Sequence, residues 1–159
     1  MTFLKLFSDP AVRDVAVGGG KGAHLATLTQ AGFPVPAGAI VMPEAYRQFM
    51  APLEPRIAEL TRNLDAADHA RIDEIHRAIE RDAGALAISP GLVAEITKFT
   101  AAAEASARWA VRSSGTAEDT ATAAFAGQHD SYLNRTTASD VIAHVRHCWL
   151  SLWSPRAIA

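Results

Sequence analysis

Two loops of the chain contain residue types that suit phosphate binding. Residues 111–119 read VRSSGTAED, and residues 18–22 read GGGKG. A guanidinium offers phosphate oxygens a planar and permanently charged set of donors, and neighbouring hydroxyls add neutral donors. A lysine beside glycines at a helix start adds a point charge and accessible backbone N–H groups. We therefore predict that Arg112 and Lys21 face the phosphates of one ligand.

Two other phosphate-binding patterns fit the glycine cluster less well. It is not a Walker A loop, because Val15 stands where the first glycine belongs and Gly22 replaces the hydroxyl that binds magnesium. Gly18, Gly20 and Ala23 satisfy the dinucleotide pattern G-x-G-x-x-A, but only three apolar residues precede them where a buried strand is needed. A dinucleotide-binding βαβ unit and a turn with a solvated lysine remain alternatives.

Other polar residues are weaker candidates for a site. Glu118 and Asp119 could position magnesium, although adjacent carboxylates are usually just solvated. His144 and His147 share a helix face without a third ligand nearby, which favours an ordinary helix surface. His129 suits either a ligand contact or a local hydrogen bond. We therefore expect no metal site and no catalytic residue in this chain.

The composition describes one soluble domain. The chain has 159 residues, of which 49% are hydrophobic, and this is enough for a core. A formal net charge of −2 offers no broad cationic face, so a nucleotide or small phosphate is expected as ligand rather than nucleic acid. Neither a signal peptide nor a membrane span is indicated, and the single Cys148, expected in the core, fits a reducing compartment. We therefore expect a cytoplasmic protein.

Apolar periodicity predicts an α+β chain. The predicted elements are a helix at 21–31 that stops at Gly32, a strand at 35–42, a helix around 46–53, helices over 54–107 with a start at Ser89, strands at 109–112 and 132–133, and a helix from Thr137 to about 152. We divide the chain into a glycine-rich phosphate element with a strand and helix (1–50), a helical scaffold (51–107), and the arginine-loop strand with C-terminal helices (108–159). A new helix starts at Ser154, so we expect a piece of a longer protein.

Taken in order, these motifs resemble a known family. The segments that carry the resemblance read GGKGAHL, VPAG, VRSSGTAED, FAGQ and RAI, at residues 19–25, 35–38, 111–119, 125–128 and 156–158. They look like the N-terminal nucleotide-binding domain of phosphoenolpyruvate synthase, pyruvate phosphate dikinase and rifampicin phosphotransferase. The resemblance implies an ATP-grasp fold, of which this chain would be the truncated N-terminal subdomain.

The resemblance also implies an activity. Members of the family cleave ATP to AMP and inorganic phosphate, and pass the β-phosphoryl group through a phosphohistidine domain to an acceptor such as pyruvate or rifampicin. Lys21 and Arg112 match the ATP-phosphate ligands of the family. Gly127 and Ser131 match the loop that closes on the nucleotide. The resemblance therefore implies that this chain is the ATP-binding portion of a phosphotransferase.

Some parts of such an enzyme are expected after Ala159. They are the second ATP-grasp half, most of the Mg2+ ligands, the phosphohistidine domain and the acceptor-binding domain, so the chain alone is expected to be inactive. Gly115 and residues 120–124 depart from the family pattern. A non-catalytic interaction or regulatory domain that keeps the fold is therefore a second hypothesis.

Overall fold

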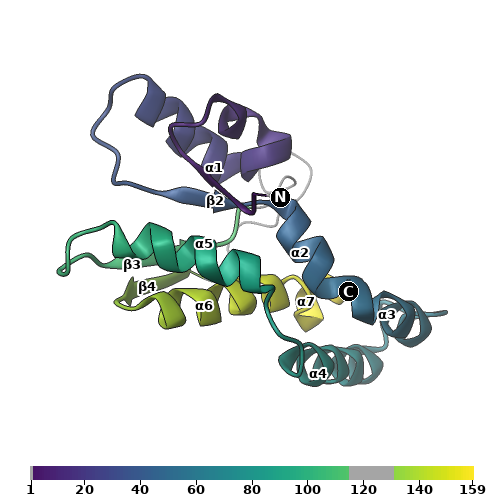
Figure 1. Ribbon diagram of the computed structural model, residues 1–159. Helices are drawn as coiled ribbons and strands as arrows, with labels where there is room; N and C mark the ends of the chain where they lie inside the picture. The colour runs from purple at the N-terminus through teal and green to yellow at the C-terminus, as the bar shows by residue number, and fades with distance from the viewer. Residues whose placement is uncertain (1, 115–130) are drawn as a thin grey trace.

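The computed structural model describes residues 2–114 and 131–159, which combine helices with two small antiparallel sheets (Figure 1). The elements follow in this order: β1 (Leu4–Leu6), the 3-10 helix η1 (Pro10–Arg13), α1 (Val15–Gln30), β2 (Ala39–Val41), α2 (Pro43–Met50), the 3-10 helix η2 (Ala51–Leu53), α3 (Glu54–Leu60), α4 (His69–Gly84), α5 (Pro90–Ala101), β3 (Trp109–Arg112), β4 (Ser131–Arg135), α6 (Ala138–Ser151) and α7 (Pro155–Ile158). This mixture confirms the predicted α+β class.

Each sheet consists of two described strands. β1 pairs with β2, with Lys5 opposite Ile40, and β3 pairs with β4, with Arg112 opposite Ser131. In Figure 1, α1 lies beside the first sheet, and α5 and α6 lie beside the second. The register of the second sheet therefore places two of the predicted site residues next to each other at the end of β3.

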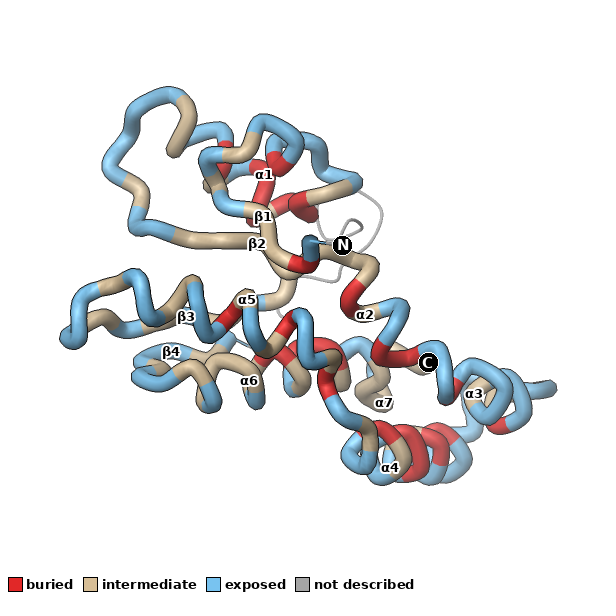
Figure 2. Tube along the Cα trace, in the orientation of Figure 1, coloured by how far each residue is buried: buried red, intermediate tan, exposed pale blue. Residues whose placement is uncertain are grey.

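The hydrophobic core is built mainly from helices. Ile75 and Ile79 of α4, and Leu92 and Ile96 of α5, are at most 2% exposed. Their spacing of four residues puts each pair on one helix face, which is the face that packs inward. Figure 2 shows buried segments on α2 and α4 that belong to this core. The same hydrophobic cluster takes in residues from each of the three regions defined from the sequence, 1–50, 51–107 and 108–159.

Glu95 attaches the first strand to the helical core. Its carboxylate accepts the backbone N–H groups of Phe3 at 2.9 Å and of Leu4 at 2.7 Å. A charged acceptor makes a stronger hydrogen bond than a neutral one. The ring of Phe3 also approaches Gly91, where a Cβ atom would lie 2.8 Å from it. Helix α5 therefore fixes β1 and, through strand pairing, β2.

Two predicted boundaries differ from the structure. The helix that was expected from residue 21 begins at Val15, because the Asp14 carboxylate accepts the N–H of Ala16 at 2.9 Å and caps it. The expected strand at 35–42 is limited to Ala39–Val41. Pro34 and Pro36 lack the N–H that a strand ladder needs, so residues 35–38 do not form part of the strand.

Three other predicted helix boundaries are confirmed. Gly32 has φ of 82° and stops α1, with the Phe33 N–H bonded to the Leu28 carbonyl at 3.0 Å. Ser89 caps α5 through the N–H of Leu92, and Thr137 caps α6. Cys148 is buried, as its apolar surroundings predicted. Among the described residues, no helix is both long and apolar enough to pass through a membrane.

Replacing Glu95 with alanine should weaken the fold. The change leaves the N–H groups of Phe3 and Leu4 without their carboxylate partner, so we expect a loss of about 1–3 kcal/mol in the free energy of unfolding. Urea denaturation measures this loss. Glu104→Ala is the control, because Glu104 is exposed, and it should change stability by less than about 0.5 kcal/mol. Equal losses in the two variants would contradict the role of Glu95.

Tyr46 should make stability sensitive to high pH. Burial raises the pKa of its phenol above the ordinary 10.0, and the hydrogen bond that Trp153 Nε1 donates at 3.0 Å opposes the rise in part. Because the unfolded chain then loses this proton at a lower pH than the folded chain, stability should fall as the pH rises above 10. Melting temperatures at pH 8 and 10.5 should drop less in Tyr46→Phe than in wild type. An equal drop would mean that the phenol ionises alike in both states.

Candidate functional site

The glycine segment is a break inside α1. Gly19 has φ of 63° and ψ of 174°, so the helix that starts at Val15 is interrupted there and resumes after it. A positive φ of this size is the left-handed region that favours glycine. A helix that restarts presents N–H groups without intrahelical partners. The break therefore creates donors that something outside α1 must satisfy.

The residues after β3 fill this break. The hydroxyl of Ser114 accepts the N–H of Gly22 at 3.0 Å and donates to the carbonyl of Gly18 at 2.7 Å. Lys21 Nζ lies 3.4 Å from the carbonyl oxygen of Ser113. The end of β3 and the glycine segment, which are more than ninety residues apart in the chain, are therefore in direct contact.

Three glycines lie in close contact with other parts of the chain, and two of them, Gly18 and Gly19, face backbone carbonyls that cannot easily move. A Cβ atom on Gly19 would overlap the carbonyl of Ser114, one on Gly22 would overlap Ile40, and one on Gly18 would overlap the carbonyl of Val12. The expectation that these glycines open their N–H groups to a ligand is wrong for Gly22, whose N–H is taken by Ser114. The Ser114 hydroxyl, expected to donate to phosphate, donates to Gly18 instead.

Arg112 lies at the end of β3 with its side chain exposed. Its Nε donates to Ser131 Oγ across the β3–β4 pair at 3.3 Å. This hydrogen bond engages the Nε edge of the guanidinium. The half-buried Lys21 reaches the carbonyl of the next residue, Ser113. The structure thus brings Lys21, Arg112 and Ser131 to one end of β3.

The positions of four other predicted residues are not described. Gly127 is outside the described residues, and so are Glu118, Asp119 and His129. Within the described ranges, no group of three His, Cys, Asp or Glu side chains is arranged to hold a metal ion.

The two histidines of α6 form a separate cluster with β4. His144 Nδ1 lies 2.7 Å from the carbonyl of Asp140, and its ring packs 4.6 Å from that of Tyr132, measured between centroids. The ring of His147 lies 5.9 Å from Tyr132. These contacts are those of a packed helix surface, as the spacing indicated.

The dinucleotide alternative is not supported by the geometry. A βαβ unit needs a buried strand that leads into the glycines, followed by a parallel strand. Residues 15–17 are helical, and both described sheets are antiparallel. The match to G-x-G-x-x-A therefore comes from a helix break and not from a dinucleotide loop.

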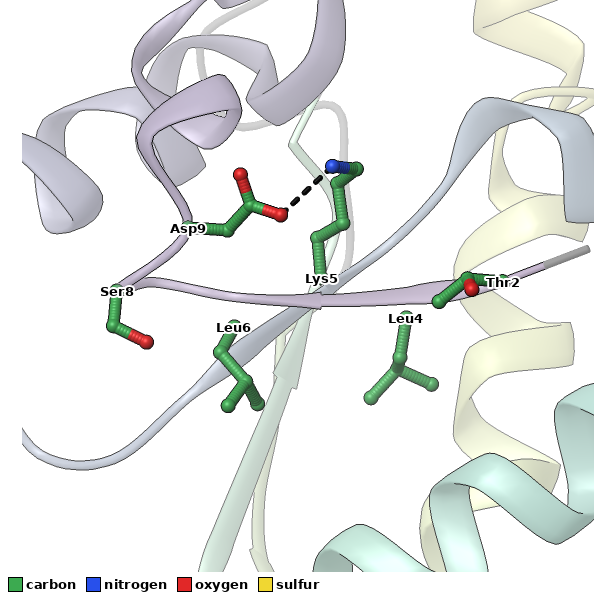
Figure 3. Close-up of a pocket in the computed structure, with 6 residues that line it drawn as sticks. All are labelled: Thr2, Leu4, Lys5, Leu6, Ser8 and Asp9. Atoms are coloured by element: carbon green, nitrogen blue, oxygen red, sulfur yellow. Dashed lines mark hydrogen bonds and ion pairs between the residues drawn. The ribbon is translucent and has the colours of Figure 1, made fainter.

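Two shallow hollows of about 530 and 520 Å3 lie away from this site. The first borders β1 (Figure 3), and the second lies between α4 and α6. In the first hollow, Lys5 Nζ contacts the carboxylate of Asp9 at 2.7 Å. This hydrogen bond, together with the N–H of Ala11, holds the pKa of Asp9 below its ordinary value. Neither hollow is lined by Lys21, Arg112 or Ser131.

Sequence reasoning missed two features of this site. The contact between the Ser114 hydroxyl and both sides of the helix break joins residues 92 and 96 positions apart, which no local pattern reveals. Ile40 packs against Gly22 and so brings β2 to the glycine segment. The only local signal was the pair of serines next to an arginine, which was interpreted as donors to a ligand.

The chain matches one protein family and several long enzymes of known name. Residues 15–159 match the family model described as pyruvate phosphate dikinase, AMP/ATP-binding domain. The chain is 37% identical to a probable phosphoenolpyruvate synthase of Methanothermobacter thermautotrophicus, over 98% of this chain and 24% of that protein. It is 40% identical to a rifampicin phosphotransferase of Streptomyces sviceus, over 91% of this chain and 17% of that protein. The chain therefore spans a quarter or less of the length of these relatives.

Replacing Gly19 with alanine should destabilise the protein more than the same change at Gly32. Both glycines have positive φ, which costs an alanine about 1–2 kcal/mol. A Cβ on Gly32 meets nothing within 4 Å, whereas one on Gly19 overlaps Ser114. We therefore expect an additional loss of about 1–3 kcal/mol for Gly19→Ala. Urea denaturation of both variants measures the difference, and equal losses would show that Ser114 does not pack into the break.

Proposed function

The chain belongs to the pyruvate phosphate dikinase AMP/ATP-binding domain family, and we propose that it supplies the phosphate-binding part of an ATP site in a longer phosphotransferase. One observation carries this proposal. The ammonium of Lys21 lies 3.4 Å from the carbonyl of Ser113, so Lys21 reaches the end of the strand that carries Arg112, and this supports a shared phosphate ligand. In this proposal the chain is the N-terminal subdomain of an ATP-grasp fold.

The chemistry of the two cations fits a triphosphate. A triphosphate spreads its negative charge over many oxygens. The compact ammonium of Lys21 and the planar guanidinium of Arg112 together suit such a charge. The contact of Lys21 Nζ with the Ser113 carbonyl is long for a hydrogen bond, and a phosphate oxygen would be a stronger partner because it is charged. Ser131 holds the Nε edge of Arg112, and the terminal nitrogens would take the phosphate oxygens.

We propose that the whole enzyme is a dikinase. ATP would be cleaved to AMP and inorganic phosphate, and the β-phosphoryl group would pass to a histidine on a domain outside this chain and then to an acceptor. The names of the relatives, phosphoenolpyruvate synthase and rifampicin phosphotransferase, suggest pyruvate or rifampicin as acceptor classes. This chain would contribute binding and orientation, and the second ATP-grasp half would complete the site.

Two parts of the proposal concern the magnesium ion and a residue outside the described ranges. ATP would arrive as its Mg2+ complex, but the described residues offer no cluster of metal ligands. Gly127, outside the described residues, would belong to a loop that closes over the nucleotide.

Calorimetric titration with Mg-ATP tests the proposal. Lys21→Ala and Arg112→Ala should each raise the dissociation constant about tenfold or more, because a hydrogen bond to a charged group contributes about 1.5–3 kcal/mol. Lys98→Ala and Arg13→Ala are matched controls, since both side chains are exposed and lie on other elements. Tight binding that survives both site substitutions would contradict the assignment. A longer protein that includes the second ATP-grasp half and still binds no nucleotide would favour the non-catalytic alternative.

A further inference from the structure

We propose that Ser114 is a positioning residue of the nucleotide site, which directs Lys21 by holding open the break in α1. This inference rests on the proposed function, because it concerns how the same site is assembled. It assigns Ser114 no contact with ATP. Instead, the hydroxyl would act through the backbone of Gly18 and Gly22, on either side of Lys21.

The first argument is the position of the hydroxyl within the helical hydrogen-bond ladder. In an uninterrupted α-helix, the N–H of residue 22 bonds to the carbonyl of residue 18. Ser114 Oγ accepts from this N–H at 3.0 Å and donates to this carbonyl at 2.7 Å. A single hydroxyl from a distant part of the chain is therefore inserted between the two partners of one helical bond, and such insertions bend helices.

The second argument is the fate of the two backbone groups when the hydroxyl is removed. Gly18 and Gly22 are both buried, so each group needs a partner. Without Ser114 Oγ the two groups lose their shared partner, and the direct helical bond between residues 22 and 18 becomes open to them. Forming that bond would abolish the left-handed conformation of Gly19 and rotate the segment that carries Lys21. The hydroxyl thus selects the kinked form of α1.

The third argument is the link to the second cation. Ser114 follows Arg112 by two residues, and the carbonyl of the intervening Ser113 is the contact of Lys21 Nζ. The anchored position of Ser114 would therefore set the direction of the Lys21 side chain and its separation from Arg112. Gly19 permits this anchor, because a Cβ atom there would overlap the Ser114 carbonyl. One hydroxyl consequently determines the spacing of the two proposed phosphate ligands.

Titration with Mg-ATP of substituted chains tests this role. Ser114→Ala should raise the dissociation constant about threefold to tenfold, the range expected for one lost hydrogen bond. Ser114→Thr keeps the hydroxyl and should restore affinity to within about twofold of wild type, by the same reasoning. Ser114→Cys keeps a side chain of similar shape with a weaker donor, and should fall between alanine and wild type.

Two comparisons separate positioning from a general loss of stability. Ser89→Ala also removes a serine hydroxyl that accepts a backbone N–H at a helix start, and it should lower the melting temperature without changing the dissociation constant for Mg-ATP. In a Lys21→Ala background, Ser114→Ala should weaken binding no further, because the residue through which it acts is already gone. Amide exchange of Gly22 should become measurably different in Ser114→Ala whether or not nucleotide is present.

The outcomes are distinguishable. A wild-type dissociation constant in Ser114→Ala overturns the positioning role alone, as does an effect that multiplies in full with that of Lys21→Ala. A failure of the longer protein, with its second ATP-grasp half, to bind Mg-ATP overturns the proposed function and this inference together. If Ser114→Ala does not fold, the threonine and cysteine variants decide, and wild-type affinity in the cysteine variant overturns the positioning role.

Discussion

The insertion of the Ser114 hydroxyl into the ladder of α1 is the interaction on which the rest of the site depends. A helix can be interrupted in a buried place only if the separated N–H and carbonyl groups find other partners. Here one oxygen serves both groups, on Gly22 and Gly18. Because this oxygen comes from the residue that follows the end of β3 by two positions, the break in α1 depends on where the second sheet lies.

The helical core supports this arrangement from a distance. Buried side chains of α4 and α5 belong to this core, and Glu95 on α5 attaches β1 to it through two backbone N–H groups. Strand pairing then fixes β2, whose Ile40 approaches Gly22 on α1. On the other side, β4 holds β3 in register and places Ser131 beside Arg112. Strand pairing and hydrogen bonds thus help to position both the glycine segment of α1 and the end of β3 that carries Arg112.

Helices with a regular apolar stripe could be predicted from the sequence, and the site chemistry only in part. The spacing of Ile75 and Ile79 and the cap at Ser89 reveal α4 and α5 because both signals are local. The break at Gly19 could not be predicted, since three apolar residues before a glycine run look the same in a strand as in a first helical turn. Its cause lies more than ninety residues away, and the roles of Lys21 and Arg112 in binding stay predictions.

The distance between Gly22 and Ser114 along the chain also has a consequence for synthesis. At about 5–20 residues per second, the ribosome adds the 92 intervening residues in roughly 5–20 s. Throughout that interval the Gly18 carbonyl and the Gly22 N–H lack the hydroxyl that joins them in the folded chain. The kink of α1 is therefore expected to become fixed only when the strand bearing the serine docks.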